Sequence, residues 1–314
     1  MREAEKIRAY LAWGAVCFFW GTTYLAISIG AKTLPVALFS GSRFALAGAI
    51  LLLLCRARGL VWPQGREWLH LGLVGTLLIT CGNTVLVWSA KHIPSGMMAL
   101  LVATAPFWMA WMEARSSGLR LGMRGLLGIA LGFVGLLLLV TPNVNSPKLG
   151  TGFLFGAIAL QFGCMAWCAG SLYSKRYPVK VHSLVGAAAQ MLLGGLVLTV
   201  YGSLSGEWAK FHLHFESAIA YIYLVIFGSI IGYGSYMYAL QKLPAAKVST
   251  YAYINPVIAV LLGWLWLHER LDWQIATSMV IILVGVALVK TSRMYQQPHS
   301  TVAPEATFEE SKST

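Results

Sequence analysis

The chain alternates between long apolar stretches and short polar breaks. The Lys, Arg, Asp and Glu residues fall mainly in the breaks. A helix needs about 20 apolar residues to cross the roughly 30 Å hydrocarbon core of a bilayer, and it satisfies its own backbone polar groups. The pattern therefore predicts an all-α membrane protein with about ten transmembrane helices, over residues 11–30, 36–56, 69–90, 95–117, 122–141, 151–174, 182–204, 217–240, 246–267 and 273–290.

Composition supports a membrane protein and argues against a soluble one. Of the 314 residues, 58% are hydrophobic and only 11% are charged, whereas soluble domains carry about 25% charged residues. The net charge of +12 comes from residues at the ends of the apolar stretches and not from one soluble face. We therefore expect a small-molecule substrate and the lipid bilayer as partners, with no nucleic acid. A monomer and a homodimer are both compatible with the sequence.

The positions of the basic residues predict the orientation. If the N-terminus is cytoplasmic, seventeen of the 23 Lys and Arg residues fall on the cytoplasmic side and six fall outside or in the outer half of a span. Cytoplasmic loops are enriched in Lys and Arg. The sequence thus predicts a multi-pass protein of the inner (plasma) membrane with both termini in the cytoplasm.

The sequence also repeats itself. Gly82, Pro94, Pro106 and Gly135 recur 150 residues later, and Trp20, Arg43 and Gly48 are matched 147 residues later by Trp167, Gln190 and Gly195. Each half has five spans, and an odd number turns the second half upside down. We expect a first five-helix repeat over 1–144, a second, inverted five-helix repeat over 145–293, and a disordered cytoplasmic tail over 294–314.

Several short motifs occur in the same order as in a known family. They are Trp20-Gly21, Ser42-Arg43-Phe44, Ile93-Pro94-Ser95-Gly96, Leu243-Pro244-Ala245-Ala246, Asn255-Pro256-Val257 and His268-Glu269-Arg270-Leu271. Over about residues 9–290 the chain resembles the EamA-type transporters of the drug/metabolite transporter superfamily. The resemblance implies a ten-helix bundle of inverted repeats that exports amino acids, related metabolites or toxic compounds. One departure is Ser117–Leu121, which occupies the first-half counterpart of the Glu269 turn without a glutamate.

Polar side chains inside the spans are candidates for substrate binding. Arg43 lies about seven residues inside the outer end of its span, or roughly 10 Å deep. A charge at that depth usually faces the bundle interior or water, but a long side chain can also extend to the surface. Gln190, Gln161 and Asn83 offer uncharged hydrogen-bonding groups at depth, for a substrate or for a neighbouring helix.

Aromatic residues near the middle of the spans complete the predicted substrate-binding set, which is Trp20, Tyr24, Trp167, Tyr233 and Tyr236. Rings at this depth lie away from the membrane interfaces, so they line either a cavity or ordinary helix contacts.

Pro106 and Pro256 are candidate hinges, because they lie near the middle of the fourth and ninth spans at matching positions. A proline within a helix removes one hydrogen bond and crowds the carbonyl four residues earlier. Those carbonyls, of Val102 and Ala252, are then open to a substrate or to helix bending. A packing kink without ligand contact is the alternative.

We expect no catalytic residue, metal site or cofactor. Glu113 is the one acidic residue within the expected spans, and the five cysteines have no His or carboxylate at a metal-ligand spacing. No P-loop is present. The sequence therefore favours a secondary transporter, an exporter of an amino acid or related metabolite working by alternating access. The competing interpretations are a membrane-embedded enzyme and a non-carrier channel.

Overall fold

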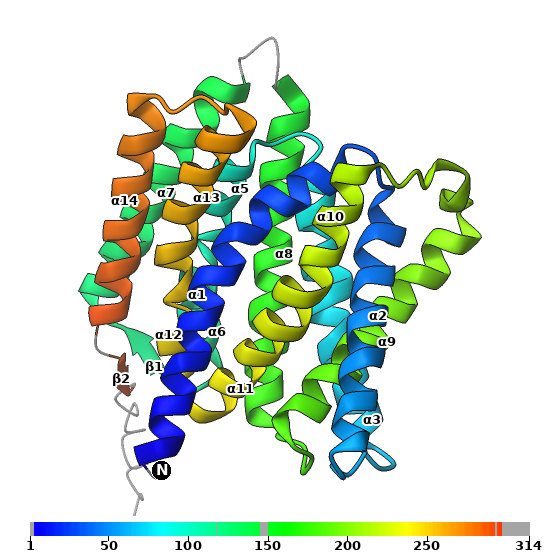
Figure 1. The fold of residues 1–314 in the computed structure, drawn as a ribbon. Helices are drawn as coiled ribbons and strands as arrows, with labels where there is room; N and C mark the ends of the chain where they lie inside the picture. The colour runs from blue at the N-terminus through cyan, green and yellow to red at the C-terminus, as the bar shows by residue number, and fades with distance from the viewer. Residues whose placement is uncertain (1–2, 118, 145–149, 293, 297–314) are drawn as a thin grey trace, which may run out of the picture.

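The computed structural model describes residues 3–117, 119–144, 150–292 and 294–296 as a bundle of long helices (Figure 1). The elements of the first half are α1 (Glu3–Ala31), α2 (Val36–Ala57), α3 (Glu67–Gly75), η1 (Thr76–Asn83), α4 (Thr84–Ser89), α5 (Ser95–Val102), α6 (Ala105–Ser116), β1 (Leu119–Leu121) and α7 (Met123–Val144). Those of the second half are α8 (Gly150–Arg176), α9 (Ser183–Leu204), η2 (Glu207–Lys210), α10 (Phe215–Tyr223), η3 (Leu224–Tyr233), α11 (Gly234–Lys242), α12 (Ala245–Val248), α13 (Tyr251–Leu267), α14 (Trp273–Thr291) and β2 (Met294–Gln296).

The predicted number and type of spans are confirmed. Within the described residues, nine helical segments are long and apolar enough to cross a membrane, and Tyr251–Leu267 is a shorter apolar helix that makes a tenth. Large apolar side chains such as Leu137 and Phe162 are more than 60% exposed on the outside of the bundle. Such a surface suits contact with lipid chains, which need no polar covering.

The third and eighth spans each contain a π-helical segment. It covers Thr76–Asn83 in one and Leu224–Tyr233 in the other. Asn83 and Tyr233, the last residues of the two segments, are 150 positions apart and therefore correspond in the repeat. Wide helical turns of this kind occur frequently at functional sites.

The fourth and ninth spans are broken helices, which corrects the expectation of continuous ones. The fourth span stops after Val102 and restarts at Ala105, so Pro106 lies in the first turn of α6. A proline there loses no hydrogen bond, because the first helical N–H groups have no partner in any case. The ninth span is interrupted at Ser249 and Thr250, and Pro256 lies inside α13 as expected.

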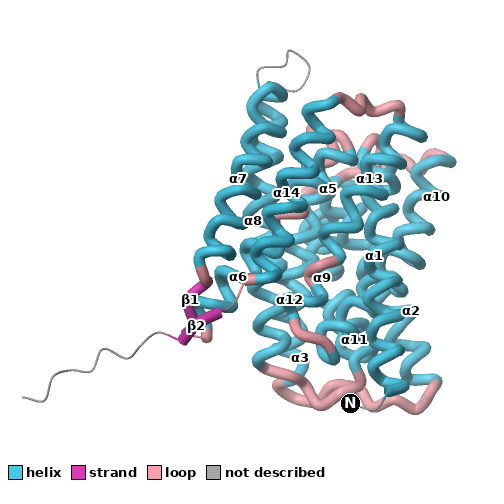
Figure 2. Tube along the Cα trace, turned by 90° about the vertical axis from the view of Figure 1, so that its left-hand side faces the viewer, coloured by secondary structure: helices cyan, strands magenta, loops and turns pink. Residues whose placement is uncertain are grey.

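Glycines allow two helix pairs to approach closely. A Cβ atom at Gly128 of α7 would lie 2.5 Å from the carbonyl oxygen of Gly285 in α14, and one at Gly285 would lie 2.6 Å from that of Gly128. Figure 2 shows α7 and α14 side by side. The corresponding helices α2 and α9 meet in the same way, through Gly41 and Gly195. Small residues at these positions are what close packing in a membrane requires.

The two halves start at opposite ends of the bundle. The chain enters α1 at the end marked N in Figure 1, whereas α8, the first helix of the second half, begins at the other end. The first helices of the two halves, α1 and α8, therefore run in opposite directions.

The start of the expected disordered tail is a strand. Met294–Gln296 pair antiparallel with Leu119–Leu121, with Tyr295 opposite Arg120. Backbone hydrogen bonding to an otherwise unpaired segment orders these three residues, which composition alone does not reveal. Residues 297–314 lie outside the described residues.

Candidate functional site

A cavity of about 90 Å³ lies between the helices of the two halves. Its walls come from α1, α2, η1, α5, α6, α8, η3 and α13. The lining residues are Trp20, Thr23, Tyr24, Ile27, Arg43, Phe44, Gly82, Asn83, Leu86, Val102, Ala105, Leu160, Gly163, Cys164, Trp167, Gly228, Tyr233, Tyr251 and Asn255. Binding sites for drug-sized ligands usually measure about 300–1,000 Å³, so in this conformation the cavity is narrow.

Arg43 supplies a positive charge to the cavity wall. The side chain is 2% exposed. One terminal nitrogen, Nη2, donates a hydrogen bond to Asn83 Oδ1 at 2.8 Å, and the guanidinium lies 4.3 Å from the centre of the Phe44 ring. Its Nε is buried without a hydrogen-bond partner among the described residues. No carboxylate lies among the described lining residues, and the charge faces the Asn83 amide dipole and the rings of Phe44 and Phe39.

Asn83 holds Arg43 in place. Its side-chain oxygen accepts the bond from Arg43 and a second one from Ser40 Oγ at 3.2 Å. Because Asn83 ends the π-helical segment η1, a change in that segment would move the partner of the buried charge.

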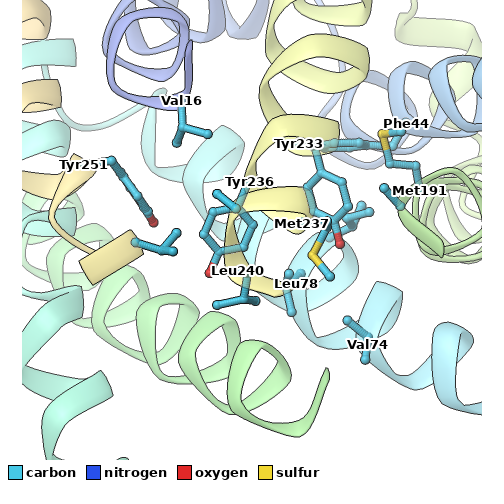
Figure 3. Close-up of a cluster of buried hydrophobic side chains, with 14 of the residues drawn as sticks. Val16, Phe44, Val74, Leu78, Met191, Tyr233, Tyr236, Met237, Leu240 and Tyr251 are labelled. Atoms are coloured by element: carbon cyan, nitrogen blue, oxygen red, sulfur yellow. The ribbon is translucent and has the colours of Figure 1, made fainter. Parts of the chain in front are cut away.

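Aromatic rings form one side of the site. The Trp20 ring lies 5.4 Å from Trp167, 5.1 Å from Tyr251 and 5.0 Å from Tyr236, measured between ring centres. Its indole N–H donates to the carbonyl oxygen of Gly228 in η3 at 3.0 Å. Figure 3 shows Tyr236 between Tyr233 and Tyr251. The rings thus connect the first span with the π segment and with the broken ninth span.

Six of the nine predicted binding residues line the cavity, and three do not. The six are Trp20, Tyr24, Arg43, Asn83, Trp167 and Tyr233. Tyr236 lies behind the wall, where its hydroxyl oxygen accepts from the Trp167 indole at 3.1 Å and lies 2.7 Å from Ser171 Oγ. Gln190 accepts a hydrogen bond from the Tyr233 hydroxyl at 2.8 Å. Both support rings of the wall.

Gln161 binds the break in the fourth span. Its side-chain oxygen accepts hydrogen bonds from Thr104 Oγ1 at 2.8 Å and Trp108 Nε1 at 2.9 Å, and its amide nitrogen donates to the carbonyl oxygen of Leu101 at 3.2 Å. These are the polar groups that a broken helix leaves exposed inside the protein. In this conformation Gln161 stabilises the break and does not line the cavity.

Three polar lining residues were missing from the predicted set, Thr23, Tyr251 and Asn255. Tyr251 and Asn255 lie one turn apart on α13, and all three are buried. The Asn255-Pro256 motif marked this position in the sequence, but only the proline was predicted to have a functional role. The asparagine beside it is the residue that borders the cavity.

Such an arrangement can bind and enclose a small molecule. A buried cation, amide and hydroxyl groups, and aromatic faces line a cavity between two structurally related halves. No group of three or more His, Cys, Asp or Glu residues suited to a metal ion occurs in the described part of the chain. The fold and cavity fit the class of a multi-pass membrane transporter.

Comparison with known proteins identifies the family. The sequence matches the EamA-like transporter family twice, over residues 7–141 and 154–291. It is 33% identical to the "Uncharacterized inner membrane transporter YedA" of Escherichia coli K12, over 97% of both chains. The chain belongs to the EamA-like transporter family and contains two units of it, as the motifs predicted.

More distant similarities agree with this assignment. The "Probable terminal-alkyne amino-acid exporter" of Streptantibioticus cattleyicolor is 24% identical over 80% of this chain and 82% of its own. A crystal structure with 21% sequence identity has a TM-score of 0.66 and covers 89% of this chain and 95% of that one; it supports the fold. The family and its relatives are transporters, which favours a carrier over the membrane-embedded enzyme.

Proposed function

We propose that the protein is a secondary carrier that exports a small carboxylate-bearing metabolite, such as an amino acid or a related compound, by alternating access. The observation that carries the proposal is Arg43. It is a buried cation on the wall of a cavity between the two halves, and it has no acidic partner among the described lining residues. A carboxylate in the cavity would compensate this charge and accept from the unpartnered Nε.

The arrangement of the two halves supports alternating access. The first helices of the two halves begin at opposite ends of the bundle, and in inverted-repeat carriers the substrate site lies between the halves near the middle of the membrane. Broken helices in both halves border the cavity through Val102, Ala105, Tyr251 and Asn255. Hinge movement belongs at these breaks, next to Pro106 and Pro256.

The proposed direction of transport and the proposed membrane location rest on the distribution of Lys and Arg and on the names of two relatives. Lys and Arg are concentrated on the side that carries the termini, which favours cytoplasmic termini. One relative is named as an inner membrane transporter and another as an amino-acid exporter.

A flux assay tests the proposal. Purified protein in proteoliposomes is screened with radiolabelled L-amino acids and related carboxylates, each paired with its neutral amide. We expect saturable transport of at least one carboxylate and at least tenfold weaker transport of its amide. Flux that rises linearly with concentration would indicate a channel, and equal transport of acid and amide would remove Arg43 from substrate recognition.

A further inference from the structure

Two carboxylates bind the starts of helices at the end of the bundle opposite the N-terminus. Glu269, in the loop between α13 and α14, accepts hydrogen bonds from the backbone N–H groups of Ser95 at 2.7 Å and Gly96 at 3.0 Å, at the start of α5. Glu207 accepts one from the N–H of Leu38 at 2.8 Å and a longer one from Ala37 at 3.4 Å, at the start of α2. Each contact joins a loop of the second half to a helix of the first.

These contacts are stronger than ordinary surface contacts. The first N–H groups of a helix have no partner within it, and they carry the positive end of the helix dipole. A carboxylate that accepts two of them makes charge-assisted hydrogen bonds. Glu269 and Glu207 are both half-buried, so water weakens the bonds only partly.

A glycine beside each carboxylate leaves room for it. A Cβ atom at Gly263 would overlap the Glu269 carboxylate and lie 2.8 Å from Ser95 Oγ, and one at Gly202 would lie 3.1 Å from Glu207 Oε2. His268 has a φ of 52°, a left-handed conformation that costs energy for a non-glycine residue. It turns the chain at the end of α13 so that Glu269 points back to α5.

At the opposite end of the bundle, the position that corresponds to Glu269 carries no carboxylate. Leu119, 150 positions before Glu269, cannot accept a hydrogen bond through its side chain. An ion pair that joins the halves at that end, Glu5–Lys242, is 3.4 Å long with side chains 42% and 35% exposed. Exposed pairs of this kind contribute little. Glu67 at that end accepts one backbone hydrogen bond from the other half, from the N–H of Lys180 at 2.8 Å, whereas Glu269 and Glu207 each accept from two N–H groups at the start of one helix of the other half.

We infer that Glu269, assisted by Glu207, is the gate residue that holds the external end of the carrier closed. The inference rests on the proposed alternating access and topology. In this conformation the two carboxylates fix the starts of α5 and α2 to the second half. For the solute to leave outward, these bonds must break and the helix starts must separate from the loops. Both glutamates position helices and make no contact with the cavity.

The test measures access to Cys164, a native residue of the cavity wall. In the parent protein the other four cysteines are replaced by serine, at Cys17, Cys55, Cys81 and Cys168. A membrane-impermeant thiosulfonate is applied to intact cells and, separately, to inside-out vesicles, and the rate of Cys164 labelling is measured from each side. The variants are Glu269→Gln, Glu207→Gln and Gly263→Ala. Gly263→Ala displaces the Glu269 carboxylate without changing a charge.

Asp272→Asn is the matched control. Asp272 lies in the same loop as Glu269 and is exposed, but its carboxylate caps its own helix by accepting from the N–H of Ile275 at 2.9 Å. Neutralising it changes the charge of the loop by the same amount and leaves the contact between the halves in place.

We expect Glu269→Gln and Gly263→Ala to raise external labelling about tenfold or more and to lower labelling from the cytoplasmic side, since a hydrogen bond to a charged group is lost. Glu207→Gln should act in the same direction and Asp272→Asn should have no effect. Parental rates in both Glu269→Gln and Gly263→Ala would overturn the assignment. So would equal rises from both sides, which indicate general loosening, or an equal rise in Asp272→Asn.

The same preparations separate this inference from the proposed function. Counterflow of an identified solute by the parent protein tests alternating access by itself. Its absence would contradict the carrier, whereas parental counterflow combined with unchanged labelling of the variants would contradict only the gate.

Discussion

Removal of the Arg43 side chain should weaken binding of a carboxylate far more than it weakens the fold. The guanidinium makes one described hydrogen bond, to Asn83 at 2.8 Å, and two ring contacts, to Phe44 at 4.3 Å and to Phe39 at 6.0 Å. A hydrogen bond to a charged group contributes about 1.5–3 kcal/mol, so Arg43→Ala should raise the Kd of a carboxylate solute by roughly 10- to 100-fold. Burying a cation without an acidic partner is itself unfavourable, so the variant should still insert and purify.

Binding can be followed by tryptophan fluorescence, because Trp20 and Trp167 line the cavity. Each carboxylate found in the flux screen is compared with its neutral amide. Arg43→Ala should bind acid and amide about equally, and Arg43→Lys should recover only part of the preference, because a point charge does not reproduce the guanidinium fork.

The control for Arg43 is Lys175→Ala, which removes a cation that does not line the cavity. Lys175 Nζ donates to the carbonyl oxygens of Leu240 and Leu243. The Lys175→Ala variant should bind the carboxylate with the wild-type Kd. An unchanged Kd in Arg43→Ala, or an equal loss in Lys175→Ala, would refute a direct contact between Arg43 and the substrate.

Three further predictions concern hinges, topology and packing. Pro256→Ala should slow transport more than it changes Kd, because the added N–H can form the hydrogen bond that is missing inside α13, and Pro106→Ala, in the first turn of α6, should have the smaller effect; a wild-type rate in Pro256→Ala would reduce that proline to a packing residue. A cysteine at Ser300 should resist an impermeant reagent in intact cells, and its labelling would overturn the cytoplasmic placement of the C-terminus. Gly285→Ala should destabilise the detergent-solubilised protein by about 1–3 kcal/mol, seen as a lower Tm, whereas Gly14→Ala, with open space around it, should not.

The spans were predictable because a bilayer imposes one length and one composition on every helix. Most of their ends agree with the structure within a few residues, for example 36–56 against Val36–Ala57, but the first helix begins at Glu3, well before the predicted start at residue 11. The interruptions were harder to predict. The π-helical segment Thr76–Asn83 contains no proline, and its wide turn depends on packing between helices that are distant in sequence.

The candidate binding residues were chosen by their depth and their repeat position, and there are physical reasons why some of them line the cavity and others do not. Arg43 is at the cavity because a buried charge needs a polar space. Its repeat counterpart Gln190 is not, because an uncharged amide can be satisfied by one neighbour, the Tyr233 hydroxyl. Gln161 likewise bonds to the break in the fourth span. Depth alone does not tell which hydrogen-bonding partner a polar side chain has.

The central claim is that one site in this protein binds a solute alternately from each side of the membrane. Counterflow in proteoliposomes tests it most directly. Vesicles preloaded with an unlabelled carboxylate identified in the flux screen are diluted into a trace of the labelled compound without any ion gradient. A carrier of this kind should accumulate label transiently above equilibrium, and Arg43→Ala should reduce that accumulation. Label that only equilibrates, with or without preloading, would contradict alternating access.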